Sequence, residues 1–156
     1  MNNASGLLES LTRDHIAVNI NALSWEEAVE CSGRLMVDTG LTQKYYIEAM
    51  INTIKSLGPY CVIAPGIAMP HARPEDGVIQ TGFSLITLAQ PVEFGNKAND
   101  PVDIVIGLAA LDKKTHLTAL KEIATYLSDD TFNHNLRAAK TKKDVLNLLD
   151  SKRKET

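Results

Sequence analysis

The run VDIVIGLAAL, residues 102–111, is apolar at nearly every position. A run of this kind is typical of a β-strand that is covered on both faces, because a half-exposed strand alternates apolar and polar residues. The preceding segment IQTGFSLITLAQ, residues 79–90, is rich in residues that favour strands and predicts a second one. Helical patterns lie on either side of these segments in the chain. The sequence therefore predicts an α/β fold, with a mixed β-sheet flanked by helices.

The N-terminal half predicts one strand, two helices and a proline-rich region. The segment HIAVNI, residues 15–20, alternates apolar and polar residues as a strand does. Ser24 and Glu27 have capping-box spacing for a helix over residues 25–39. Thr42 can cap a second helix, which ends at Gly58. Four of the six prolines then follow, so CVIA (61–64) and GIAM (66–69) are expected to be short extended pieces.

The C-terminal part predicts three helices. Asp112 can cap the first, whose expected apolar face comprises Leu117, Leu120, Ile123, Ala124 and Leu127. A shorter helix is expected around residues 131–139, and Thr141 with Asp144 forms a capping-box pattern for the last. No repeat or linker divides the chain, so residues 1–156 are predicted to form a single domain.

Composition and charge exclude several classes of protein. The net charge of −3 gives no electrostatic reason to expect nucleic acid as a partner. No uninterrupted apolar run approaches the roughly 18 residues of a membrane span, and the start MNNASGLLES lacks the pattern of a secretory signal. A cytoplasmic protein is expected. Cys31 and Cys61 lack metal-site or redox spacing and are expected to be free structural thiols.

The loop APGIAMPHARPEDGV, residues 64–78, is the strongest candidate for chemistry. Pro70 stiffens the backbone that enters His71, and Gly66 permits a conformation that other residues avoid. A neutral imidazole held in this way has one nitrogen free to act as a nucleophile, while the other can be held by a carbonyl group. The alternative is a surface histidine without a role.

His116 is the second candidate, because it follows the buried strand and falls at the start of the next helix. Active sites in α/β folds favour the carboxyl ends of strands, and helix N-termini favour anions. His116 could therefore stabilise a phosphoryl group on another residue, or simply pack at the edge of the helix. Arg73 could bind a phosphate or dock a partner, or be merely solvated. His15 and His134 are expected to have no catalytic role.

The sequence contains no motif for the other common kinds of catalytic or binding site. The sequence lacks the glycine patterns of nucleotide sites, the G-x-S-x-G elbow, and the histidine and cysteine pairs of zinc sites, so no metal is expected. A hydrolase that used His71 as general base would lack a recognisable nucleophile.

The segments GIAMPHA and HLTALKEIATYL resemble the enzyme IIA domains of the mannitol/fructose class of the bacterial phosphoenolpyruvate-dependent sugar phosphotransferase system (PTS). The resemblance covers essentially the whole chain, because the SWEEAV and YYIEAM helices and the PVDIVIGLAA strand fall in family order. It implies a phosphotransferase component without a cofactor. It implies that His71 accepts a phosphoryl group from phospho-HPr and passes it to a cysteine or histidine of enzyme IIB, with His116 in support. The membrane enzyme IIC would be an indirect partner.

Two departures from the mannitol-type pattern indicate a subgroup. Mannitol-type members have an arginine late in the second helix, where this chain has Thr53 at or near the position. Arg73 follows the Pro-His pair closely and could supply the missing positive charge. The stretch GPYCVIAPGIAMPHARPEDGV looks most like the subgroup that serves L-ascorbate uptake. The alternatives are a IIA for fructose, mannitol or a pentitol, a regulatory IIA-like protein, and an interaction domain whose histidines are incidental.

Phosphoryl transfer between proteins requires an accessible ring. His71 is therefore expected in a shallow depression, and we expect Ile67, Met69 and Val78 to form its apolar rim because they are close in sequence.

Overall fold

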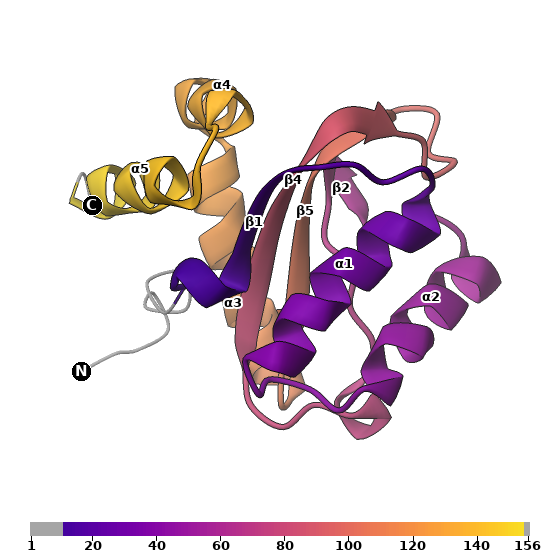
Figure 1. Ribbon diagram of the computed structural model, residues 1–156. Helices are drawn as coiled ribbons and strands as arrows, with labels where there is room; N and C mark the ends of the chain where they lie inside the picture. Colours follow the sequence, from indigo (N-terminus) through magenta and orange to yellow (C-terminus); the bar gives the residue numbers. More distant parts are fainter. Residues whose placement is uncertain (1–10, 155–156) are drawn as a thin grey trace.

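The computed structural model describes residues 11–154, whose strands form one five-stranded mixed sheet (Figure 1). In sheet order the strands are β1 (Ile16–Ile20), β4 (Gly82–Val92), β5 (Val102–Ala109), β3 (Ile67–Ala68) and β2 (Val62–Ala64). β1 and β4 are parallel, as are β5 and β3, whereas β4–β5 and β3–β2 are antiparallel. The predicted α/β class and mixed sheet are confirmed. The segment MNNASGLLES lies outside the described residues.

Helices cover both faces of the sheet. They are α1 (Trp25–Asp38), α2 (Tyr45–Leu57), α3 (Lys113–Leu127), α4 (Asp130–Ala138) and α5 (Lys142–Lys154). Figure 1 shows α1 and α2 on one side of the sheet and the three C-terminal helices on the other. Two short 3₁₀ turns, η3 (Arg13–His15) and η4 (Pro74–Asp76), complete the elements. Within residues 11–154, no helix combines the length and the apolar character needed to cross a membrane.

The core consists of two apolar clusters, one on each side of the sheet. Ile104, Ile106 and Leu108 of β5 belong to the cluster under the C-terminal helices, and Val105 and Ala109 belong to the cluster under α1 and α2. Alternate side chains of a strand point to opposite faces, so a strand that fills both clusters needs apolar residues on both faces. Asp103, near the start of β5, is the charged exception. The nearly continuous apolar run is thereby explained.

Most of the predicted helix starts are confirmed. Ser24 Oγ accepts a hydrogen bond from the Glu27 N–H (3.2 Å), although the Glu27 carboxylate accepts from the Leu23 N–H (3.0 Å) instead of closing the box on Ser24. At α5 the box is complete, because Thr141 Oγ1 accepts from the Asp144 N–H (3.1 Å) and Asp144 accepts from the Thr141 N–H (3.2 Å).

The expected cap of the second helix is wrong. Thr42 is buried and forms a β-bridge with Val78. This bridge pairs the Thr42 backbone with the segment that follows η4, so α2 begins later, at Tyr45, and has no side-chain cap. The expected end at Gly58 is confirmed, with φ +88° at that glycine.

The expected apolar face of α3 is only partly confirmed, although Asp112 caps the helix as predicted. Ile123 is buried and Leu120 and Leu127 pack against the core cluster, but Leu117 and Ala124 are exposed. The buried side chains are Ala119, Glu122, Ile123 and Tyr126. The buried stripe includes Tyr126, which packs edge-on against Phe132 of α4, with ring centroids 5.7 Å apart. Leu117, next to His116, is left 55% exposed.

Both cysteines are free, as expected. Cys61 is buried in the core and Cys31 is half-buried on α1.

Candidate functional site

The fold brings His71 and His116 together. β3 and β5 are parallel neighbours, with Ile67 opposite Ile104, so their carboxyl ends reach the same edge of the sheet. His71 follows β3, and His116 lies in the first turns of α3, the helix that follows β5. The two imidazole rings pack edge to face, with centroids 4.7 Å apart and an angle of 76° between their planes.

The ring of His71 is held in one orientation. Its Nδ1 lies 2.9 Å from the Met69 carbonyl oxygen, which can only accept, so Nδ1 carries the proton and donates it. The Nε2 lone pair is therefore free. Burial lowers the pKa of His71, and the nearby His116 lowers it further, against the opposing effect of the bond to Met69. The ring is therefore neutral and nucleophilic near pH 7.

His116 presents a second neutral ring beside this nucleophile. Burial lowers its pKa below the usual value. Its backbone N–H bonds to the Asp112 carbonyl (3.0 Å), which holds the residue in the first turns of α3. A neutral imidazole here can donate a hydrogen bond to an oxyanion without adding a permanent charge.

Two tyrosines that the sequence analysis did not single out support the loop. The hydroxyl of Tyr46, which is wholly buried, donates to the Leu108 carbonyl (2.9 Å) and accepts from the Ala72 N–H (2.9 Å). The hydroxyl of Tyr60 donates to the His71 carbonyl (3.1 Å), and its ring packs edge-on against His71. A tyrosine on the buried face of a helix needs a hydrogen-bond partner for its hydroxyl. This requirement is the sequence feature from which a structural role for Tyr46 could have been predicted.

Gly66 and its neighbours anchor the start of the loop. Gly66 has φ +77°, a conformation that favours glycine, and a Cβ there would lie 2.6 Å from an Arg137 nitrogen. Arg137 Nε donates to Asp103 (2.8 Å), and its Nη2 donates to the Pro65 carbonyl (3.2 Å). At the other end, the Pro70 carbonyl accepts from the Leu108 N–H (3.0 Å) and so ties the loop to β5.

A cleft of about 730 Å³ opens beside the two histidines. It is lined by one face of α2, by Tyr60, by the loop after His71 and by the start of α3. The other lining residues are Ala49, Asn52, Thr53, Ser56, Leu57, Ala72, Arg73, Pro74, Asp76 and Lys113. The cleft is large enough to admit side chains of a partner protein.

The predicted apolar rim is wrong. Ile67 and Met69 are buried, because β3 lies within the sheet and both side chains belong to the core cluster under the C-terminal helices. Val78 is half-buried, and its backbone forms the bridge to Thr42. The exposed apolar side chains that line the cleft are instead Leu57 and Tyr60.

Arg73 lines the cleft but is already paired. Its Nη2 and Nε donate to the Asp76 carboxylate at 3.0 and 3.2 Å, and its Nη1 lies 3.6 Å from Glu75. Both carboxylates belong to η4, which immediately follows the arginine.

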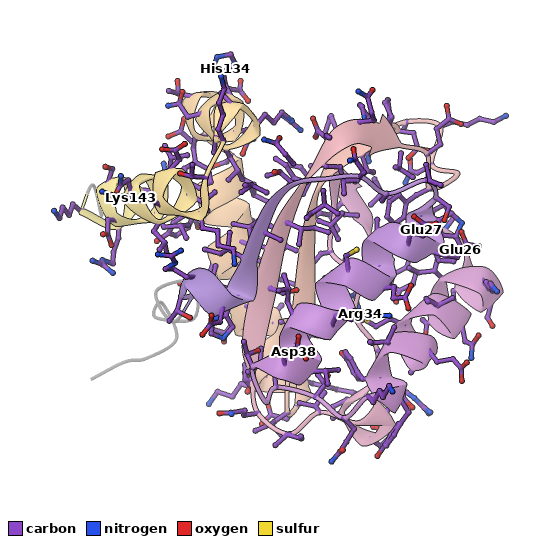
Figure 2. All side chains as sticks on the ribbon, viewed as in Figure 1. Glu26, Glu27, Arg34, Asp38, His134 and Lys143 are labelled. Atoms are coloured by element: carbon purple, nitrogen blue, oxygen red, sulfur yellow. The ribbon has the colours of Figure 1, made fainter. Side chains whose placement is uncertain are left out.

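The other two histidines lie outside the cleft. His15 accepts a bond from the Thr12 N–H (3.0 Å) at the start of η3, and His134 points outward from α4 (Figure 2). Within residues 11–154, no group of three or more histidine, cysteine, aspartate or glutamate side chains could hold a metal ion.

Comparisons with known proteins agree with this architecture. Residues 9–152 match the family described as "Phosphoenolpyruvate-dependent sugar phosphotransferase system, EIIA 2". The chain is 42% identical over 146 residues to the ascorbate-specific PTS system EIIA component of Salmonella choleraesuis (strain SC-B67), covering 92% of this chain and 95% of that protein.

Solved structures of enzyme IIA proteins are similar over nearly the whole chain. The mannitol-specific cryptic phosphotransferase enzyme IIA CmtB from Escherichia coli superposes with a TM-score of 0.81 at 34% identity, over 91% of this chain and 96% of that one. The Escherichia coli enzyme IIAMtl, in complex with phosphorylated enzyme IIBMtl, gives a TM-score of 0.81 at 28% identity, over 91% and 98%. The chain thus belongs to the EIIA 2 family of the phosphoenolpyruvate-dependent sugar phosphotransferase system, as the ordered resemblance of its motifs predicted.

Proposed function

We propose that this chain is a cytoplasmic phosphocarrier that takes a phosphoryl group from phospho-HPr onto Nε2 of His71 and passes it to enzyme IIB during the uptake of L-ascorbate. The observation that carries the proposal is the hydrogen bond from His71 Nδ1 to the Met69 carbonyl, which leaves Nε2 of a neutral ring beside an open cleft. Enzyme IIC, in the membrane, would depend on this chain only through enzyme IIB.

The transfer needs positioning and charge stabilisation. The Nε2 lone pair of His71 attacks phosphorus in line, and the bond between phosphorus and the donor nitrogen breaks. The electron pair of that bond returns to the donor imidazole. The Nδ1 proton stays on His71, where the Met69 carbonyl stabilises the positive charge that develops on the ring. Transfer to enzyme IIB repeats the step with His71 as the leaving group.

The residues around His71 have separate roles in this scheme. His116 lies against the His71 ring and would donate a hydrogen bond to the phosphoryl oxygens. Gly66 and Pro70 hold the loop in place, so little reorganisation precedes the transfer. The phosphoryl oxygens would face the cleft, where a partner can reach them.

The identities favour L-ascorbate as the sugar of the system. The chain is 42% identical to an ascorbate-specific EIIA component, against 34% and 28% for the two mannitol proteins. An enzyme IIA does not touch the sugar, which the membrane component binds, so the sugar assigned to this chain depends on which enzyme IIB accepts its phosphoryl group.

The test is a reconstituted relay of phosphoenolpyruvate, enzyme I, HPr and this chain, followed by intact-mass spectrometry. One acid-labile adduct is expected on His71. His71→Ala should abolish it, whereas His116→Ala should still accept phosphate and pass it on more slowly. His134→Ala, far from the cleft, is the control. With HPr fully phosphorylated, absence of an adduct on the wild type would refute the proposal, as would total loss in both the His71 and His116 variants.

The same reaction tests the sugar. Phosphorylated protein is mixed with enzyme IIB of ascorbate, mannitol and fructose systems in turn. Fast transfer to the ascorbate IIB alone is expected, and preference for another IIB would reassign the system.

A further inference from the structure

The cleft beside His71 has two positively charged side chains among its lining residues, Arg73 and Lys113. A phosphoryl group on His71 brings close to two negative charges into this cleft. The residues of α2 that line the cleft, Thr53 among them, carry no charge, and the Thr53 hydroxyl donates to the Ala49 carbonyl (2.7 Å). His116 can donate a hydrogen bond to the phosphoryl oxygens but is neutral, so Arg73 and Lys113 are the lining residues that could supply a full positive charge.

Arg73 is poorly suited to the task. Its guanidinium already makes two hydrogen bonds to Asp76 and lies 3.6 Å from Glu75. One positive charge between two carboxylates leaves this cluster with a net charge of −1, which repels a phosphoryl group. Freeing the arginine would also leave Asp76, whose pKa the arginine lowers, facing the same anion. Arg73 instead stabilises the η4 turn.

Lys113 is better placed. It is the first residue of α3, three positions before His116, and it lines both the large cleft and a smaller hollow that His71 and His116 share. Within residues 11–154, its ammonium group makes no ion pair. The neighbouring Asp112 carboxylate is occupied by the Thr115 N–H (2.8 Å) and hydroxyl (2.7 Å). The positive end of the helix dipole adds to the attraction for an anion.

Resting on the proposed function, we infer that Lys113 is the cation that binds the phosphoryl group on His71, and that Arg73 does not contact it. An ammonium group on a flexible stem is a point charge, unlike the rigid fork of an arginine. Such a group can hold the phosphoryl oxygens and release them when enzyme IIB docks. The positive charge for the phosphoryl group would thus come from the start of α3, the helix that also supplies His116.

The experiment compares Lys113→Met, which keeps most of the stem and removes the charge, with Lys113→Arg and Arg73→Met. Each variant is mixed with phospho-HPr, and both the rate of transfer and the final ratio of the two phosphorylated proteins are measured. The final ratio is an equilibrium quantity and contains no contribution from the encounter rate. A shift in it therefore reports binding of the phosphoryl group and not the docking of HPr.

A charge-assisted hydrogen bond corresponds to about a tenfold to hundredfold effect. Lys113→Met is expected to shift the ratio towards phospho-HPr by about that factor, while Lys113→Arg retains most of it and Arg73→Met stays within about threefold. Thermal unfolding of Lys113→Met should match the wild type, because the side chain is exposed.

Two results would overturn the inference. One is a normal ratio for Lys113→Met; the other is a loss in Arg73→Met as large as that in Lys113→Met. If the wild type itself takes no phosphoryl group from phospho-HPr, the proposed function falls and the inference falls with it.

Discussion

The hydroxyl of Tyr46 offers a sharp test of how the fold holds the His71 loop. Tyr46 lies on α2 and is wholly buried. Its hydroxyl joins the Leu108 carbonyl of β5 to the N–H of Ala72, the residue directly after His71. Tyr46→Phe removes one oxygen atom and leaves the shape of the ring unchanged. The variant therefore isolates the hydrogen bonds from the packing.

The expected cost follows from the groups that lose a partner. Each buried polar group left unsatisfied costs about 1–3 kcal/mol. The Ala72 N–H and the Leu108 carbonyl both lose a bond, but Ala72 is only half-buried, so we expect the free energy of unfolding to fall by the lower part of the summed range, about 2–3 kcal/mol. In a chain of this size that corresponds to a decrease in Tm of roughly 4–12 °C. Because the released segment adjoins His71, we also expect phosphoryl transfer to slow by about tenfold.

The measurements are urea unfolding followed by circular dichroism, and the rate of transfer from phospho-HPr. Tyr45→Phe is the matched control, because Tyr45 is the neighbouring residue on α2 and is 62% exposed. The control should stay within about 0.5 kcal/mol of the wild type. A Tyr46→Phe protein as stable as the control would refute the assigned role of the hydroxyl. Lost stability with an unchanged transfer rate would show that the loop is held by other contacts.

Three further predictions follow from burial, backbone conformation and exposure. Burial lowers the pKa of His71, so the unfolded chain takes up a proton on this residue before the folded chain does as the pH falls below about 6.5, and the folded state loses stability. Urea unfolding at pH 7.5 and 5.0 should therefore show a larger loss of stability in the wild type than in His71→Asn. Equal losses in the two proteins would contradict this. Gly66→Ala should cost about 1–2 kcal/mol more than Gly58→Ala, because both have positive φ but only the first Cβ meets other atoms; equal melting temperatures would argue against the contact. Leu57→Glu should weaken HPr binding in calorimetry without loss of stability, whereas Leu23→Glu, exposed but not lining the cleft, should not; identical affinities would remove Leu57 from the docking surface.

Local sequence patterns predicted much of the fold. The nearly continuous apolar run of β5, the alternation in β1 and the caps at Ser24, Asp112 and Thr141 all lie within a few residues of the feature that they predict. Where a distant segment competed, these patterns failed. Thr42 pairs with Val78 instead of capping α2, and Tyr126, which was not among the residues expected on the apolar face of α3, is buried against Phe132 of α4.

The functional site, like the fold, could be predicted only in part from the sequence. The proline before His71 and the position of His116 at the start of a helix are visible in the sequence, as is the order of motifs that indicates the family. The distance between the two histidines, the bond from Nδ1 to Met69 and the pairing of Arg73 with Asp76 are not. The physical reason is the separation in sequence of the interacting residues. Helix caps and strand alternation depend on neighbours in the chain. The parallel pairing of β3 with β5 places one histidine against the other, and it depends on how remote segments fill a shared core.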